Sequence, residues 1–173
     1  SNDIFWMIDP LDGTKEFING SDDFTVNIGL IKNKIPIFGL IYAPSKDITY
    51  YTKNNCSYIL LNKNSEKKIE TKKNKLKYEI ALMSNSHNNK DTEDFINNNA
   101  IPSVKKVGSS LKFCLVASGE GDIYPRFGRT MEWDTAAGQA IVEAAGGKVE
   151  LLNGNALTYG KKNFINPSFI CKS

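Results

Sequence analysis

The stretch Asp9-Pro10-Leu11-Asp12-Gly13-Thr14 follows an apolar run at residues 4–8 and places two carboxylates, a turn and a hydroxyl within six residues. The apolar run is short enough for a strand buried on both faces, and Pro10 is expected to end it. Two acids this close repel each other unless a cation such as Mg²⁺ lies between them. Gly13 and Thr14 then offer backbone N–H groups that suit a phosphate oxygen. Taken alone, the stretch fits an ordinary polar turn about equally well.

A second acidic segment favours the metal interpretation. Trp133-Asp134-Thr135-Ala136-Ala137-Gly138 opens a predicted helix that runs to residue 145 and ends at a Gly-Gly pair. Asp134 is therefore expected at or near the N-cap, where an Asp is usually only structural. The small residues that follow leave this helix start open to close approach. Asp134 is thus a candidate third carboxylate for the same metals.

Together the two segments resemble the signatures of the inositol monophosphatase superfamily of Mg²⁺-dependent, Li⁺-sensitive phosphatases. Within that superfamily, the sequence around the two motifs is similar to that of the 3'(2'),5'-bisphosphate nucleotidases. The similarity extends along most of the chain, through residues 9–17 (DPLDGTKEF), 24–28 (FTVNI), 84–87 (SNSH), 108–114 (GSSLKFC), 122–130 (DIYPRFGRT), 157–162 (LTYGKK) and 166–169 (NPSF).

The resemblance implies an α/β layered sandwich, in which an antiparallel sheet is followed by a mixed α/β half and the first helical layer is missing. The corresponding expected domains are residues 1–77, with the metal-binding turn, and 78–173, with the nucleotide-binding residues. The individual strands are expected at 24–31, 35–43, 48–52, 57–61, 79–83, 122–124, 148–152 and 164–171, and further helices at 91–98 and 109–118.

The resemblance also implies roles for the acidic residues, with two or three Mg²⁺ as cofactor. Asp9 bridges two metals, the Leu11 carbonyl contributes to the first, and Asp12 with Asp134 holds the second. Asp9, Asp12 and Thr14 are then the catalytic residues, with Thr14 positioning the attacking water. The amides of Gly13 and Thr14 hold the transferred phosphate, and Asp134 also contributes to substrate binding.

Cationic and polar residues in the second half are candidates for nucleotide binding. Ser109 and Lys112 are three apart at a predicted helix start, so they would share one face and could clamp a phosphate. Arg126 adds a forked cation suited to a second phosphate. His87 is the only histidine; a lone histidine is more often structural, but the resemblance places it against the nucleotide.

These residues predict a phosphomonoesterase that removes the 3'-phosphate of adenosine 3',5'-bisphosphate to give AMP. An inositol or sugar monophosphatase and a non-catalytic nucleotide-binding remnant are the alternatives. The family carries a Glu-Glu pair and a further Asp in a segment before its first signature, and the eight residues ahead of Asp9 do not include that segment. We therefore expect the 173-residue chain alone to be catalytically incomplete.

Composition excludes several other classes of protein. With 173 residues and 40% hydrophobic content, the chain is long enough for a folded core. The net charge of +3 comes largely from residues 63–77, a lysine-rich segment without interleaved aromatics. We interpret this segment as a solvated loop and a candidate domain boundary. No nucleic-acid partner is therefore expected. No apolar run approaches the length of a membrane span, and a cytoplasmic location is expected. An uncovered sheet face would favour self-association.

Overall fold

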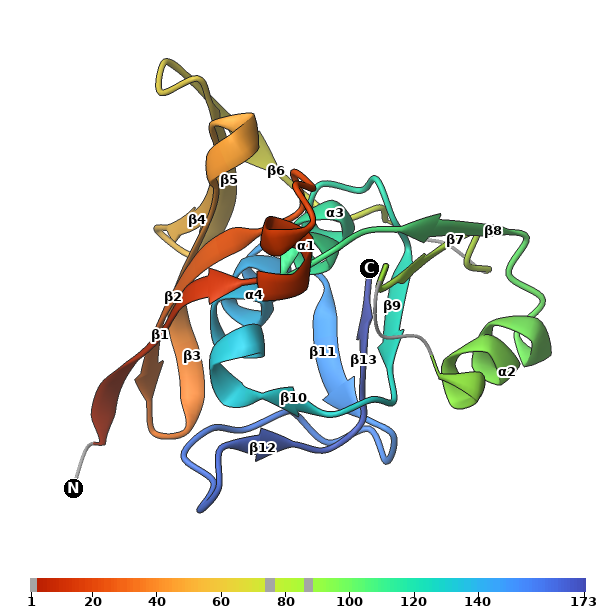
Figure 1. The fold of residues 1–173 in the computed structure, drawn as a ribbon. Coiled ribbons are helices and arrows are strands. Elements are labelled where there is room, and N and C mark those ends of the chain that lie inside the picture. The colour runs from red at the N-terminus through yellow and green to blue at the C-terminus, as the bar shows by residue number, and fades with distance from the viewer. Residues whose placement is uncertain (1–2, 74–76, 86–88) are drawn as a thin grey trace.

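The first half of the chain forms one antiparallel sheet. The computed structural model describes residues 3–73, 77–85 and 89–173 (Figure 1). Six strands pair in chain order and each is antiparallel to the next. They are β1 (Ile4–Asp12), β2 (Thr25–Lys32), β3 (Ile35–Ala43), β4 (Ile48–Lys53), β5 (Cys56–Leu61) and β6 (Ser65–Ile69).

The last of these strands corrects the interpretation of residues 63–77 as a loop. β6 lies inside that segment and pairs with β5 over its whole length. It is one of the two edge strands of the sheet, and four of its five residues are exposed. Charged residues, lysine especially, are common on edge strands because they discourage pairing with another chain. A polar composition was therefore mistaken for the absence of a strand.

A second, mixed sheet follows, with the strand order β11-β13-β9-β7-β8. β7 is parallel to β8 and β9, and the remaining pairs are antiparallel. The strands are β7 (Ile80–Met83), β8 (Ser103–Lys106), β9 (Ile123–Arg126), β11 (Lys148–Leu151) and β13 (Phe169–Lys172). β8 was not predicted because its four exposed residues carry no alternating apolar signal.

The single strand predicted at 164–171 was wrong, because this segment divides between two sheets. β12 (Ile165–Asn166) pairs with β10 (Thr130–Met131) in a separate two-stranded sheet, and β13 begins only at Phe169. Pro167 lies between the two strands and has no N–H to donate to a ladder. The chain can therefore change sheets at this point.

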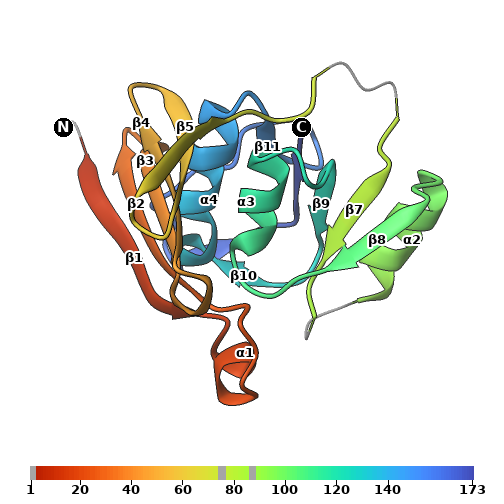
Figure 2. The ribbon, with the colours of Figure 1, turned by 90° about the horizontal axis from the view of Figure 1, so that it is seen from above.

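Two helices fill the space between the large sheets, as Figure 2 shows. These are α3 (Leu111–Ala117) and α4 (Glu132–Ala144), while α2 (Lys90–Asn98) lies on the far side of the second sheet and the short α1 (Thr14–Ile18) and a 3₁₀ turn (Pro44–Lys46) lie in connections. The predicted order, an antiparallel sheet followed by a mixed sheet with helices, is confirmed; the sixth strand of the first sheet was not predicted. Among the described residues, no helix is long and apolar enough to cross a membrane.

Close contact between α4 and the first sheet positions the site. A Cβ built on Gly39 of β3 would lie 2.2 Å from the Ala137 carbonyl oxygen, and one on Gly29 of β2 would lie 2.9 Å from the Ala136 Cβ. Only glycine permits this approach at both positions. The first turn of α4 is thereby held against the carboxyl end of β1.

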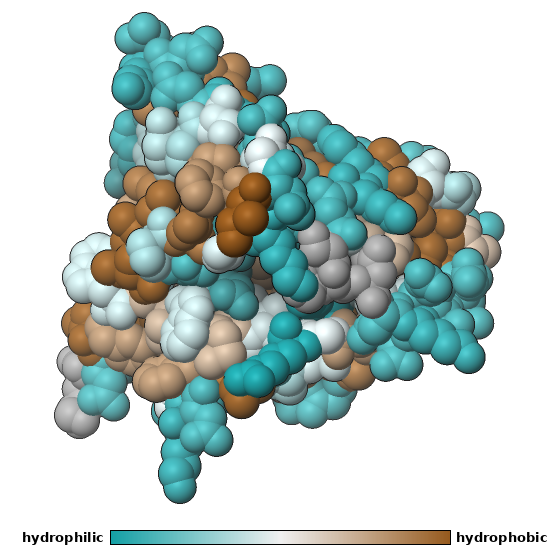
Figure 3. Space-filling view, viewed as in Figure 1, coloured by the Kyte–Doolittle hydropathy of each residue, from teal (hydrophilic) through white to brown (hydrophobic). Residues whose placement is uncertain are grey.

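The opposite face of the first sheet is open, as expected for a sheet without a covering helical layer, although residues 4–8 are apolar enough for burial on both sides. Met7 faces α4 and is buried, whereas Ile4, Trp6 and Ile8 are 56%, 57% and 54% exposed. No layer of described residues covers this side of the sheet. Apolar surface gathers on the side of the molecule where β1 and β2 run (Figure 3).

Candidate metal and phosphate site

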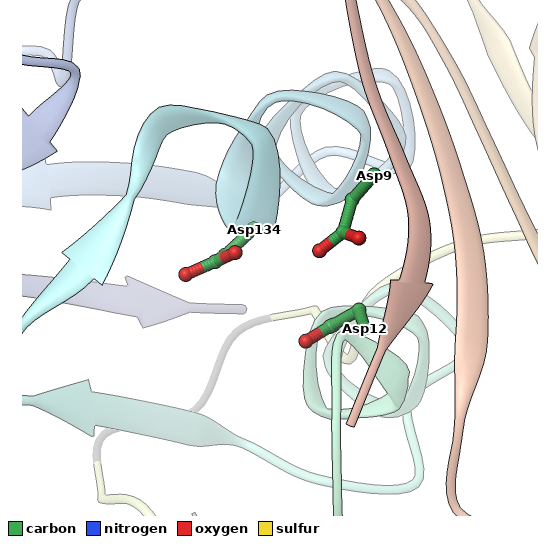
Figure 4. A group of neighbouring side chains, drawn as sticks. All are labelled: Asp9, Asp12 and Asp134. Atoms are coloured by element: carbon green, nitrogen blue, oxygen red, sulfur yellow. The ribbon is translucent and has the colours of Figure 1, made fainter. Parts of the chain in front are cut away.

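Three carboxylates meet where the end of β1 approaches the start of α4. Asp9, Asp12 and Asp134 each have an oxygen within 4.8 Å of the others, and the three side chains lie close together in Figure 4. Asp134 is the third residue of α4, and its Oδ2 accepts a hydrogen bond from the Met131 N–H at 2.7 Å. Asp134 therefore lies near the N-cap, as expected, in the first turn of the helix and three residues after the N-cap residue Met131.

A β-bulge brings Asp9 and Asp12 to the same face. Asp9 pairs with Asn27 and Asp12 pairs with Thr25, so β1 advances three residues while β2 advances two. Without the extra residue, side chains three apart on a strand would point to opposite faces. Pro10 lies within this bulge and does not end β1, contrary to expectation, because the irregular pairing removes the need for its missing N–H.

The electrostatics of this cluster suit a divalent cation. Burial, together with the neighbouring charges of Asp12 and Asp9, raises the pKa of Asp134 to about 7, against the opposing hydrogen bond from the Met131 N–H. Burial, with a contribution from Asp12, also raises the pKa of Asp9. A hard cation with oxygen ligands, such as Mg²⁺, would relieve both the desolvation and the repulsion. The residues present therefore fit the metal that the sequence predicts.

The turn after β1 packs closely against Asp23 and Ser109, which are distant in the sequence. Gly13 has a left-handed φ of 84° and precedes α1, and a Cβ at this position would meet the Asp23 carbonyl oxygen at 2.9 Å and the Ser109 Cβ at 3.1 Å. The hydroxyl of Thr14 donates to the Leu11 carbonyl at 3.2 Å. Gly13 and Thr14 thus lie beside the residues predicted to bind nucleotide.

Lys112 is the most deeply placed cation of the site. It is only 3% exposed, and its Nζ donates to the carbonyls of Val107 at 3.1 Å and Ser109 at 2.6 Å. The same Nζ lies 5.2 Å from the centre of the Tyr124 ring. Burial lowers the pKa of Lys112 to about 8. Its charge is therefore costly in the absence of a counter-anion.

Ser109 does not share a helix face with Lys112 as predicted, because α3 begins at Leu111. Ser109 has a φ of 48°, and this left-handed turn precedes the helix. Its Oγ is buried without a hydrogen-bond partner among the described residues. Arg126, from β9, donates to the Ser84 hydroxyl at 3.1 Å and to the Arg129 carbonyl at 3.2 Å.

One cavity of about 360 Å³ joins these groups. It is lined by both acidic and cationic candidates, including Asp12, Gly13, Thr14, Ser109, Lys112, Arg126 and Asp134. Asp9 is not part of the lining, but its carboxylate lies within 4.8 Å of the Asp12 and Asp134 carboxylates, which are. His87 lies outside the described residues.

Two polar residues of the site were missed by sequence reasoning. Ser110 donates to Asp12 through both its N–H and its hydroxyl, and Asn27 donates to both Ser110 and Asp12. Both occur within sequence stretches that carry the family resemblance, but hydroxyl and amide side chains give no chemical signal by themselves. Only the pairing of β2 with β1 and the approach of α3 bring them to the carboxylate.

A sequence profile of the inositol monophosphatase family matches residues 1–172. The chain belongs to the inositol monophosphatase family. It is 45% identical over 168 residues to a protein named 3'(2'),5'-bisphosphate nucleotidase CysQ from Buchnera aphidicola, covering 95% of this chain and 63% of the relative. It is 39% identical over 172 residues to the protein of the same name from Escherichia coli K12, covering 95% and 66%.

Solved structures agree with this family membership. The crystal structure of CysQ from Bacteroides thetaiotaomicron, described as a bacterial member of the inositol monophosphatase family, superposes with a TM-score of 0.87 at 38% identity. The match covers 99% of this chain and 70% of that one. The chain thus spans about two-thirds of the length of the relatives that it matches.

Proposed function

We propose that this chain carries the site of a divalent-metal-dependent phosphomonoesterase that converts adenosine 3',5'-bisphosphate to AMP and phosphate. The observation that carries the proposal is one cavity whose lining contains the acids Asp12 and Asp134 together with the cations Lys112 and Arg126. A substrate with two phosphates has one for the acidic residues, through a metal, and one for the cations. Relatives at 39–45% identity that bear the name of bisphosphate nucleotidases support the same assignment.

The acidic residues would hold the reacting phosphate through Mg²⁺. Asp9, Asp12 and Asp134 would be ligands, with the Leu11 carbonyl as a further oxygen donor. When bound, the cation supplies polarisation of the phosphoryl group and stabilisation of the charge on the leaving oxygen. The Thr14 hydroxyl, which already donates within this turn, would orient the attacking water.

Backbone and side-chain donors would complete the phosphate contacts. The amides of Gly13 and Thr14 stand at the start of α1 and would donate to the transferred phosphate. The buried Oγ of Ser109, unpartnered among the described residues, would donate to the retained phosphate together with Lys112 and Arg126. His87 is proposed to contact the nucleotide on the sequence resemblance alone.

Comparison of substrates tests the proposal. We expect the 173-residue chain alone to turn over slowly, because it spans only about two-thirds of the length of the nucleotidases that it resembles. A chimera that joins the preceding segment of the Buchnera relative to this chain should release phosphate from adenosine 3',5'-bisphosphate with Mg²⁺, leave AMP, and be inhibited by Li⁺. Preference for inositol 1-phosphate in the same assay would favour the inositol phosphatase alternative, and binding without turnover by the chimera would favour the non-catalytic one.

The open face of β1 supports a further proposal about association of this chain. Ile4, Trp6 and Ile8 expose apolar surface that a second copy could cover. Trp6→Ser should shift the chain toward monomer in concentration-dependent light scattering. Leu152→Ser, which changes a residue with the same 57% exposure elsewhere, is the control. A wild-type chain that stays monomeric and binds no apolar dye would contradict this proposal.

A further inference from the structure

Each carboxylate of the acidic cluster has one oxygen engaged by the chain. Asp9 Oδ1 accepts from the Leu11 N–H at 3.0 Å, and Asp134 Oδ2 accepts from the Met131 N–H at 2.7 Å. Both donors are backbone groups two or three residues away. Asp9 also has a side-chain hydrogen bond with Asp134, so a cation bound here would take the place of a proton shared between these two carboxylates.

Asp12 is held differently, by residues far away in the sequence. Its Oδ2 accepts from the Ser110 N–H at 2.7 Å, the Ser110 hydroxyl at 2.5 Å and the Asn27 amide at 3.3 Å. Three donors on one oxygen fix the rotation of the carboxylate. Only Oδ1 then remains for a metal.

The donors are themselves fixed by burial and by each other. Ser110 is 2% exposed and Asn27 is 1% exposed. The Asn27 amide donates to the Ser110 Oγ at 2.8 Å, which leaves the single hydroxyl proton to be donated by Ser110. The carboxylate at 2.5 Å is closer to this hydroxyl than the Asp134 carbonyl at 2.9 Å and carries the negative charge, so it is the preferred acceptor.

We propose that Ser110 and Asn27 are positioning residues that restrict Asp12 to one-oxygen coordination and thereby make the site select Mg²⁺ over Ca²⁺. The inference rests on the metal site of the proposed function. Mg²⁺ is small and demands near-octahedral geometry, whereas Ca²⁺ takes more oxygens at longer distances and readily accepts both oxygens of a carboxylate. Releasing Oδ2 would remove a constraint that costs Ca²⁺ more than Mg²⁺. Partners behind a metal ligand typically change metal affinity by about 10–100-fold.

The test is calorimetric titration of the 173-residue chain with Mg²⁺ and, separately, with Ca²⁺. Ser110→Ala should weaken Mg²⁺ binding by about tenfold, at the lower end of that range because the backbone N–H still donates. Ca²⁺ binding should weaken less or tighten, so the ratio of the two affinities falls. Ser118→Ala, at the other end of α3, is the matched control and should leave both affinities unchanged.

The outcomes are separable from those of the proposed function. A folded Ser110→Ala chain in which both metals weaken equally, or neither weakens, overturns the selectivity role and leaves the metal site standing. A wild-type chain that binds neither ion overturns both. Asn27→Ser, whose shorter side chain removes the amide donor, should lower the same ratio and decides the question if Ser110→Ala does not fold. Circular dichroism melting establishes folding in each case.

Discussion

The acidic end of the site comprises Asp9, Asp12 and Asp134, and the cationic end comprises Lys112 and Arg126. The two ends carry opposite charges, and backbone groups hydrogen-bond the charged side chains at both. At the acidic end, Asp9, Asp12 and Asp134 repel each other, and each accepts a chain N–H on one oxygen. At the cationic end, the ammonium of Lys112 is buried against carbonyl oxygens. Asp12 partly offsets the charge of Lys112, yet burial remains the largest influence on the pKa of Lys112 and on that of Asp134.

The opposite pKa shifts at the two ends indicate which kind of ion each end would bind. The pKa of Asp134 is raised and that of Lys112 is lowered, in both cases chiefly by burial, so each group is driven toward its neutral form without a partner. A cation restores the charge at one end and an anion restores it at the other. Variants should therefore separate metal binding from nucleotide binding.

The largest effect is expected from Asp134→Asn. Losing a ligand charge should abolish Mg²⁺ binding and lower phosphate release by the chimera about 10³-fold or more, since metal stabilisation is worth several kcal/mol. The metal-free chain should melt at a higher temperature than wild type, because repulsion with Asp9 and Asp12 is relieved. Calorimetry and thermal melting measure the two effects. Asp91→Asn in α2 is the control, and undiminished activity of Asp134→Asn would remove Asp134 from the metal site.

Lys112→Met should affect the other end. Loss of a charged donor should weaken adenosine 3',5'-bisphosphate binding by about 10–100-fold, because hydrogen bonds to charged groups are worth about 1.5–3 kcal/mol. Mg²⁺ affinity should stay close to that of wild type. Nucleotide titration with Lys106→Met, an exposed lysine of β8, as control measures this. Equal loss of nucleotide and metal binding would show that the two ends are not separable.

The pH dependence should be smaller and opposite in sign at the two ends. Mg²⁺ affinity should rise as the pH increases through about 7, because protonated Asp134 is a poor ligand. Nucleotide affinity should fall as the pH increases through about 8, as Lys112 loses its proton. Titrations between pH 6 and pH 9 check both trends; a Mg²⁺ affinity that is flat with pH would contradict the first.

Stability of the metal-free chain should follow the same sign for Asp134. Its folded-state pKa is above the value of about 3.9 for an unfolded chain, so the folded state binds more protons between these values. The contribution of this group to stability should therefore fall as the pH rises from about 4 to about 7. Denaturant melts of wild type and Asp134→Asn compare the slopes, and identical slopes would count against a buried charge at this position.

Sequence predicted the acidic cluster because its chemistry is local. Asp9 and Asp12 are only three positions apart in the sequence, and Asp134 is identifiable as a residue of a helix start. The way in which the cluster is assembled could not be predicted. The bulge that turns Asp9 and Asp12 to one face depends on pairing with β2, and Pro10 alone suggested a strand end.

For the cationic end, the sequence indicated candidate residues but not how they are arranged in space. Ser109 and Lys112 were expected on one helix face, yet a left-handed turn at Ser109 precedes α3 and the cavity brings them together instead. Strand boundaries were accurate where apolar alternation was strong, as in β3, which matches its predicted limits. They failed where strands are short, polar or at an edge, as in β6 and β8.

Coupling between metal and nucleotide tests the two-ended site most directly. The 173-residue chain is titrated with adenosine 3',5'-bisphosphate and with AMP, each with and without Mg²⁺, and chromatography afterwards checks that the nucleotide is intact. If one phosphate meets the acidic end through the metal, Mg²⁺ should tighten the bisphosphate by about 5–150-fold, the usual range of coupling between sites. AMP, which keeps only the phosphate assigned to Lys112 and Arg126, should be unaffected. Equal tightening of both nucleotides, or of neither, would contradict the account.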